Sequence, residues 1–376
     1  MVGPIVIESE QSILRKIRQL NWGLMILLIL VACVGFTALY SAAGGNFSPW
    51  ASKQAVRFCV GFVAMIIVAL IDVRLWYRLS WAIYAVALVL LVIVELKGRI
   101  GMGAQRWIDL GFMQLQPSEV MKVAVVMALA RYFHSVTLDD MRSIRVLILP
   151  ALIVVAPVAL VMTQPDLGTS LMIVMASGGM FFIAGASLWL FGGAFALAAA
   201  SIPVAWHLMH GYQQKRVLTF LNPESDPLGS GYHITQSKIA LGSGGIDGKG
   251  FLQGTQSHLN FLPEKQTDFI FTLWAEEWGL LGGLVLLSLF GLIFMYALWI
   301  SSRCRHNYGR YLALGLGINF SLYIITNISM VMGLIPVVGV PLPMVSYGGT
   351  AMLTVLIGFG LMMSCNVYRD SKVTRV

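Results

Sequence analysis

The chain has 376 residues, of which 58% are hydrophobic and 11% are charged, and its formal net charge is +8. Its mean hydropathy is +0.80. This composition excludes a soluble globular protein and predicts an integral membrane protein. The polar stretches are too short to build a second folded unit, so we expect one membrane domain over residues 1–376.

Ten segments are apolar for long enough to cross a bilayer, which takes about 20 residues of helix. Long unbroken runs exclude the short alternating strands of a membrane barrel, and backbone groups in lipid must bond within their own segment. The expected fold class is therefore an all-α polytopic bundle of about ten transmembrane helices. Only Gly185 and Ser187 separate the sixth span from the seventh. The expected spans are 22–43, 55–72, 76–95, 117–134, 145–163, 169–186, 188–209, 269–300, 311–335 and 346–367.

Basic residues gather in the short loops and tails that ten spans would place on the side of both termini. Because positive loops stay inside, we expect cytoplasmic tails at 1–21 and 368–376 and a large extracytoplasmic loop at 210–268, between helices 7 and 8. The positive charge then reflects topology, and no nucleic-acid-binding surface is expected. Neither a disulfide nor a zinc site is expected from the four cysteines, because the sequence has no CxxC pair.

A second outer loop, residues 96–116, carries Arg106 and Trp107. In the structural interpretation, Trp107 is an interfacial anchor and Arg106 snorkels or pairs with Asp109. In the functional interpretation, Arg106 holds a pyrophosphate and Trp107 packs on a sugar or lipid. The sequence leaves both interpretations open.

Glu119 and Lys122 are three residues apart in the fourth span, so they share one helix face. They either neutralise one another inside the bundle or line a polar cavity that orients a substrate. Charges within a span are functional candidates, and the same pair would also suit a proton relay in a transporter.

The large loop has a basic part, an amphipathic part and a glycine-rich part. Arg216 carries the same ambiguity as Arg106, between a structural and a pyrophosphate-binding role. Residues 234–241 are expected to form a short surface helix. The glycine cluster 242–250 does not match a nucleotide-binding phosphate loop, although a backbone nest for pyrophosphate remains open.

Asp268 is the last acid of this loop and stands at the mouth of the very hydrophobic eighth span. Thr267 and Asp268 are good helix N-cap residues, which is the structural interpretation. In the functional interpretation, Asp268 is a general base that accepts a proton from a sugar hydroxyl while the lipid of the substrate stays in the membrane.

Several other polar residues are expected to serve structure. Glu276 and Glu277 cannot both face one cavity wall, so polar contacts inside the bundle are expected for them. Asn319 and Asn327 are expected to bond across helices. The proline- and glycine-rich link 332–349 is expected to be a rigid outer turn.

Motifs spread over positions 116–349 resemble the SEDS family, whose members act in shape, elongation, division and sporulation. Residues 250–260 look like the elongation branch, RodA. The matching stretches are Gln116-Pro117-Ser118-Glu119, Gln164-Pro165-Asp166-Leu167-Gly168-Thr169, Gly242-Ser243-Gly244-Gly245, 261–271, Gly333-Leu334-Ile335-Pro336, Pro341-Leu342-Pro343 and Ser346-Tyr347-Gly348-Gly349.

The resemblance implies a peptidoglycan glycosyltransferase of the bacterial cytoplasmic (inner) membrane, which polymerises lipid II during cell elongation and rod-shape maintenance. Asp268 matches the essential loop aspartate of the family. Glu119 and Lys122 match fourth-helix residues that face a central cavity. The implied partners are a class B penicillin-binding protein, which cross-links the glycan strands, and other membrane proteins of the elongation complex.

In the expected reaction, Asp268 deprotonates the 4-hydroxyl of the acceptor N-acetylglucosamine, which attacks the anomeric carbon of the donor with inversion. Undecaprenyl pyrophosphate leaves, and its charge must be neutralised. Arg106, Arg216, Lys122 or a divalent cation (Mg²⁺ or Mn²⁺) would supply that charge, and the sequence does not choose among them. The alternatives are a lipid II flippase or transporter, and a non-catalytic scaffold of the elongation machinery.

Overall fold

A computed structural model describes residues 12–101, 104–109, 111, 114–137, 139–209, 211–222, 230–258 and 264–374. A helix occupies each of the ten predicted spans, so the all-α bundle is confirmed. Within the described residues, seven of these helices (α2, α3, α4, α6, α12, α13 and α14) are long and apolar enough to cross a membrane by length and composition. The ten are α2 (Trp22–Ala42), α3 (Trp50–Leu70), α4 (Val73–Lys97), α5 (Pro117–Ser135), α6 (Ile144–Thr163), α7 (Leu167–Ile183), α8 (Leu188–Leu208), α12 (Ile270–Arg303), α13 (Asn307–Val331) and α14 (Gly349–Val367).

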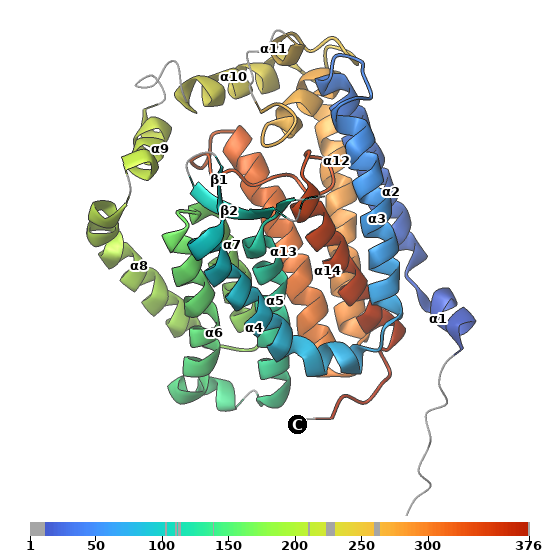
Figure 1. Cartoon of the computed structure of the whole chain (residues 1–376), viewed down its shortest axis with the longest axis vertical. Helices are drawn as coiled ribbons and strands as arrows, with labels where there is room; N and C mark the ends of the chain where they lie inside the picture. Colours follow the sequence, from blue (N-terminus) through green and yellow to red (C-terminus); the bar gives the residue numbers. More distant parts are fainter. Residues whose placement is uncertain are drawn as a thin grey trace, which may run out of the picture.

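The short break predicted between the sixth and seventh spans is present. Helix α7 ends at Ile183 and α8 begins at Leu188. Between them Gly185 has a φ of +90°, a conformation that glycine adopts without a steric penalty. Helix α8 then runs beside the rest of the bundle, whereas α13 packs against α5, α7, α12 and α14 in its interior (Figure 1).

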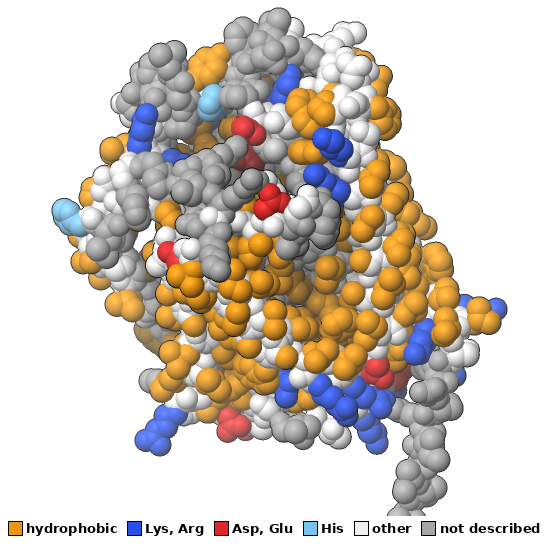
Figure 2. Space-filling view, viewed as in Figure 1, with side chains coloured by type: hydrophobic (Ala, Val, Ile, Leu, Met, Phe, Trp, Pro, Cys, Tyr) orange, Lys and Arg blue, Asp and Glu red, His pale blue; other side chains and the backbone are white. Residues whose placement is uncertain are grey.

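Both ends of the described chain lie at one end of the bundle. The short helix α1 (Ile13–Gln19) and the C-terminal residues lie there, while α10 (Ser230–Ser243) and α11 (Thr255–His258) lie at the opposite end (Figure 1). Figure 2 shows a broad hydrophobic band across the molecule, with Lys and Arg side chains gathered along its edge near the termini. This arrangement has the charge asymmetry expected of a membrane protein.

The outer loop that precedes α5 forms a small antiparallel sheet of order β1-β2-β3. Its strands are β1 (Arg99–Gly101), β2 (Ala104–Asp109) and β3 (Gln114–Leu115). Trp107 pairs with Arg99, and Ile108 pairs with Leu115. The sequence predicts a loop here. Strands of two to six residues give too little alternation to be recognised, and the contacts of β2 with α4 and α5 and of β3 with α14 come from the tertiary fold.

The large loop holds three helices in its described parts. They are α9 (Gly211–Leu221), α10 and α11. The helix predicted at 234–241 is present and lies within α10. Helix α10 packs against α9, α11, α12 and α13, so the loop covers the outer end of the bundle.

Helix α12 is broken at Gly279, whose φ of +62° and ψ of −161° are not helical. The glycine-rich residues 244–250 repair the break. Lys249 N and Gly250 N donate to the carbonyls of Glu276 and Glu277, at 3.0 Å each. Leu280 N and Leu281 N donate to the carbonyls of Gly245 and Ile246, at 2.9 and 3.2 Å. The loop therefore satisfies backbone groups that would otherwise be unpaired beside the membrane.

The two adjacent acids of α12 point in different directions, as the sequence analysis expected. Lys249 Nζ lies 2.8 Å from Glu276 Oε1, and Gln256 N donates to the same oxygen at 2.9 Å. Ser41 of α2 donates its hydroxyl to Glu277. These acids tie the broken part of α12 to the loop on one side and to the bundle on the other.

Replacing Gly248 by Ala should destabilise the protein. Gly248 has a φ of +83°, and an added Cβ would overlap the Glu277 carbonyl oxygen and the neighbouring backbone. Overpacking of this kind costs about 1–3 kcal/mol of unfolding free energy. The measurement is the midpoint of thermal unfolding in detergent. Gly242→Ala is the control, because no atom lies within 4 Å of the added Cβ. Equal stability of the two variants would refute the loop's role in closing the break.

Candidate active site

The candidate site is organised by the outer segment 332–348, which connects α13 to α14 and has no helix or strand. Asn327, near the end of α13, donates from Nδ2 to the Asp268 carbonyl at 2.9 Å and to the Val340 carbonyl at 2.8 Å. One fully buried amide thus joins Asp268, two residues before α12, to the outer segment. Asn319 and Asn327 were expected to bond across helices. The partners of Asn327 are instead backbone carbonyls of non-helical segments, and Asn319 Oδ1 has no partner within the described residues.

Ser346 makes a second connection between the same two pieces of chain. Its hydroxyl donates to the Thr267 carbonyl at 2.6 Å and accepts from Leu342 N at 2.7 Å. Beside it, Tyr347 N donates to the Gln266 carbonyl at 2.7 Å. Three consecutive carbonyls, from Gln266 to Asp268, are therefore held by α13 and the outer segment, in a set of hydrogen bonds that we call the backbone clamp.

Helix α3 supports the outer segment from the other side. Gln54 is fully buried and donates from Nε2 to the Ser346 carbonyl at 2.9 Å. The guanidinium of Arg57, one turn along, lies 4.8 Å from the ring centroid of Tyr347. Neither residue was among the site residues predicted from the sequence. A glutamine one turn from an arginine at the start of a span is the signal that could have found them.

Asp268 itself presents a half-buried carboxylate with no hydrogen bond or ion pair within the described residues. It does not cap α12, because the cap position is Phe269 and has no side-chain cap bond. Thr267 does not cap it either, since its hydroxyl bonds to Glu264 Oε2 at 2.9 Å. The capping interpretation is therefore wrong, and the carboxylate remains available to a substrate.

The pKa of Asp268 is raised from 3.8 to about 6. Burial is the largest cause, the negative charge of Glu264 adds to it, and the positive charge of Arg216 opposes it. A carboxylate with such a pKa is still mostly ionised at pH 7 and is a stronger base than an ordinary aspartate. Gly339 lies against it, since a Cβ added there would be 3.6 Å from Asp268 Oδ2.

Arg216 belongs to the same site. It projects from the exposed side of α9 and donates from Nη1 to the Val337 carbonyl of the outer segment at 3.2 Å. The structure therefore brings Arg216 and Asp268 together around residues 337–340, although 52 positions separate them in the sequence.

Glu119 and Lys122 form a buried ion pair one level deeper in the bundle. Lys122 Nζ lies 2.7 Å from Glu119 Oε1, and the two side chains are 2% and 4% exposed. Tyr323 donates its hydroxyl to Glu119, and its ring centroid lies 4.1 Å from Lys122 Nζ. Tyr323 and Asn327 are one turn apart on α13 and share one face of that helix. This face therefore contacts both the Glu119–Lys122 pair, through Tyr323, and the backbone clamp, through Asn327. The pair is a neutralised cluster, and within the described residues no hydrogen bond or ion pair joins it to Asp268.

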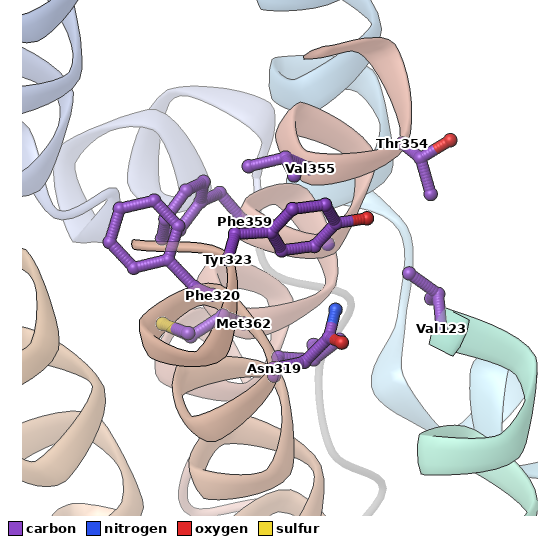
Figure 3. A pocket seen from close by; sticks show the side chains of 10 residues that line it. Val123, Asn319, Phe320, Tyr323, Thr354, Val355, Phe359 and Met362 are labelled. Atoms are coloured by element: carbon purple, nitrogen blue, oxygen red, sulfur yellow. The ribbon is translucent and has the colours of Figure 1, made fainter. Parts of the chain in front are cut away.

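A small cavity lies beside this cluster, between α5, α13 and α14. Figure 3 shows Asn319 and Tyr323 of α13 on its wall, with Val123 of α5 and Thr354 of α14. Asn319 Oδ1 is buried and has no hydrogen-bond partner among the described residues. The volume of the cavity suits about one water molecule. Asn319, Tyr323 and Asn327 recur every four residues, and this polar stripe is the signal that identifies Tyr323 from sequence.

Arg106 is bound to the Gln164-Pro165-Asp166 motif. It donates from Nη2 to the Pro165 carbonyl at 2.5 Å and from Nε to the Gln164 carbonyl at 3.3 Å. Its Nε also lies 3.9 Å from Asp166 Oδ2. Asp166 in turn caps α7 by accepting from Thr169 N at 3.2 Å. The guanidinium thus braces the start of α7, a partner that the sequence analysis did not foresee.

Trp107 is half-buried on β2, next to Arg106. It lies on the small sheet, whose strand β2 contacts α4 and α5. Within the described residues, no group of three or more His, Cys, Asp or Glu side chains is arranged to hold a metal ion.

Comparison with known proteins identifies the chain's relatives. Residues 18–371 match the family of cell cycle proteins that comprises FtsW, RodA and SpoVE. The chain is 45% identical to the peptidoglycan glycosyltransferase MrdB of Escherichia coli K12, over 91% of this chain and 93% of that protein.

Two solved structures have the same fold. A chain from a study of how a peptidoglycan synthase complex coordinates polymerization and crosslinking superposes with a TM-score of 0.82. It is 30% identical, over 94% of this chain and 99% of that chain. The rod shape determining protein RodA of Thermus thermophilus superposes with a TM-score of 0.71 at 28% identity, over 94% and 98%.

Replacing Lys122 by Met should lower the free energy of unfolding by about 3–5 kcal/mol, because it leaves Glu119 buried without its cation. The double variant Glu119→Gln/Lys122→Met should recover much of that loss, since it removes both charges. The measurement is thermal unfolding of the single and double variants in detergent. The coupling would be contradicted if the destabilisation of the double variant equalled the sum of the destabilisations of Glu119→Gln and Lys122→Met.

Proposed function

The chain belongs to the FtsW/RodA/SpoVE family and is a multi-pass membrane homologue of peptidoglycan glycosyltransferases, and we propose that it polymerises lipid II into β-1,4-linked glycan strands with inversion. The observation that carries this proposal is the carboxylate of Asp268. It is half-buried at the outer end of the bundle, has a raised pKa and has no hydrogen-bond partner within the described residues.

In the proposed step, Asp268 accepts the proton of the 4-hydroxyl of the acceptor N-acetylglucosamine. The oxygen then forms a bond to the anomeric carbon of the donor N-acetylmuramic acid, whose bond to pyrophosphate breaks. Undecaprenyl pyrophosphate leaves with the electron pair, and an α-linked donor gives a β-1,4 bond. The backbone clamp on residues 266–268 supports this role, because a general base must be held within hydrogen-bond reach of its proton.

Among the cations predicted to neutralise the leaving pyrophosphate, Arg216 has the strongest support. Its charge acts on Asp268, and its side chain is exposed at the outer end of the bundle. Arg106 already braces the motif at Gln164 to Asp166, and Lys122 is buried against Glu119. A guanidinium that donates to a pyrophosphate oxygen stabilises charge that develops as the bond breaks.

The remaining predicted site residues take supporting roles in this proposal. Glu119 and Lys122 fix the polar interior of α5 and α13 beneath the clamp. Trp107 offers an aromatic face to the sugar or lipid of the substrate, and Arg106 holds the adjacent strand in place. We assign the proposed chemistry to these side chains.

The proposed topology places both termini in the cytoplasm of a bacterium and α10 and α11 outside its inner membrane. The concentration of basic side chains at the end that carries the termini supports this orientation. We propose a class B penicillin-binding protein as the cross-linking partner. A structural relative comes from a study of polymerization and crosslinking by one peptidoglycan synthase complex, which supports this pairing.

Asp268→Asn should slow glycan polymerisation by about 10²–10⁴-fold, because an amide does not accept the proton. The same change should raise the thermal unfolding midpoint at pH 7. The folded-state pKa of Asp268 lies above its ordinary value, so its contribution to stability is complete below about pH 4 and is lost as the pH rises through about 6. The neutral amide avoids that loss.

The assay combines purified protein, its penicillin-binding partner and labelled lipid II, with glycan strands resolved by gel. Glu264→Gln is the control, since it removes a neighbouring acid and leaves Asp268 in place. Normal polymerisation by a folded Asp268→Ala variant would contradict the assignment of Asp268 as the general base. Flipping of lipid II in liposomes without polymerisation would favour the transporter instead.

A further inference from the structure

Gln54 of α3 bonds to the backbone on both sides of Tyr347. Its Nε2 donates to the Ser346 carbonyl at 2.9 Å, and its Oε1 accepts from Gly348 N at 3.4 Å. The side chain of Gln54 is fully buried, so both ends of its amide are used where water does not compete for them. The outer segment is therefore held at Tyr347 from the side of α3.

The same short stretch of the outer segment holds the chain beside Asp268. The Ser346 hydroxyl donates to the Thr267 carbonyl at 2.6 Å. Tyr347 N donates to the Gln266 carbonyl at 2.7 Å. The stretch thus bonds to α3 on one side and to the residues before Asp268 on the other, and it transmits the position of α3 to them.

Helix α3 is a rigid reference for these bonds because it packs against α14 at two glycines. A Cβ added to Gly61 of α3 would overlap the Leu356 side chain, and one added to Gly360 of α14 would lie 2.7 Å from the Met65 carbonyl oxygen. Backbones that approach this closely leave the two helices little room to slide. Gln54 is therefore carried by a fixed element.

Asn327 and Gln54 hold different points of the backbone clamp. Asn327 fixes the Asp268 carbonyl from α13. Gln54 fixes the two preceding carbonyls from α3, through Ser346 and Tyr347. A chain that is held at one point still rotates about it, and a second fixed point removes that freedom. The direction of the Asp268 carboxylate therefore depends on both helices.

We propose that Gln54 is a positioning residue for polymerisation, which aims the carboxylate of Asp268 at the acceptor hydroxyl by holding the backbone at Tyr347. This inference rests on the proposed function and adds α3 to the elements that build the site. Within the described residues no hydrogen bond or ion pair joins Gln54 to Asp268, so Gln54 acts through the backbone. A misplacement of about 1 Å at a reacting group costs about 10²-fold in rate.

The test is polymerisation of labelled lipid II by purified full-length Gln54→Met with its penicillin-binding partner. Methionine has about the length of glutamine and no amide, so the Ser346 carbonyl and Gly348 N lose their shared partner. We expect kcat to fall about tenfold to 10²-fold with KM unchanged, because the buried side chain of Gln54 does not contact the substrate in this proposal.

The pH profile of the same variant separates positioning from a general loss of stability. Burial is the largest cause of the raised pKa of Asp268, while Glu264 raises this pKa further and Arg216 lowers it. A carboxylate released from the backbone clamp meets more water. The acid-side midpoint of the rate should therefore fall in Gln54→Met, from about 6 toward the ordinary aspartate value.

Gln54→Glu is the conservative variant. Its carboxylate keeps an acceptor for Gly348 N but presents no donor to the Ser346 carbonyl, and the protonated acid regains that donor. Burial raises the pKa of such an acid. The rate of Gln54→Glu relative to wild type should therefore rise about tenfold as the pH falls from about 8 to about 5.5.

Asn366→Leu is the matched control. Asn366 is also a buried amide that donates to a backbone carbonyl, that of Gln19 at 3.0 Å, but it lies at the end of α14 far from the outer segment. This variant should keep the wild-type kcat and midpoint. Hydrogen exchange adds a readout that needs no activity. The amides of residues 342–348 should exchange faster in Gln54→Met and not in Asn366→Leu.

Three results would overturn the positioning role. One is an unchanged kcat and midpoint in folded Gln54→Met where Asp268→Asn is inactive, which leaves the proposed function intact. Another is an equal loss in Asn366→Leu. If Gln54→Met does not fold, the third is a rate of Gln54→Glu that keeps a constant ratio to wild type at every pH. No polymerisation by wild type would instead contradict the proposed function, and hydrogen exchange would still decide whether Gln54 holds the outer segment.

Discussion

The two hydrogen bonds from Asn327 Nδ2 are the interaction on which the rest of the site depends. One amide holds the backbone on both sides of the reactive carboxylate, at the Asp268 carbonyl and at the Val340 carbonyl. Because the amide bonds backbone and leaves the side chain of Asp268 alone, the acid is fixed in position and still lacks a partner. Buried polar groups in a membrane bundle are costly unless they are bonded, so this arrangement is held strongly.

The glycine-rich loop solves a related problem at the break in α12. A helix that stops and restarts leaves carbonyls and N–H groups unpaired, and the hydrocarbon of a bilayer has no hydrogen-bond partner for them. Residues 244–250 supply these partners from their own backbone, through the N–H groups of Lys249 and Gly250 and the carbonyls of Gly245 and Ile246. This accounts for the glycines without a phosphate-binding nest. It also couples the large loop to the helix that begins two residues after Asp268.

Sequence patterns that depend on local chemistry predicted the fold well. Apolar runs gave the ten helices, and Gly185 marked the α7–α8 turn, because hydropathy and backbone freedom act within a few residues. Contacts between distant segments were not predictable in the same way. Arg106 has Pro165 and Asp166 as partners rather than the nearby Asp109, and Glu119 is shared by Lys122 and Tyr323. Aspartate is a common helix N-cap residue, and only the structure shows that Asp268 does not cap α12.

The most direct test of Asp268 as the general base is the pH dependence of single-turnover lipid II polymerisation. The wild-type rate should fall on the acid side with a midpoint near pH 6. Because Arg216 lowers the pKa of Asp268 and Glu264 raises it, Arg216→Gln should move the midpoint to higher pH, and Glu264→Gln should move it to lower pH. A midpoint that stays in place in both variants, or a wild-type rate that is flat between pH 5 and 8, would contradict the assignment.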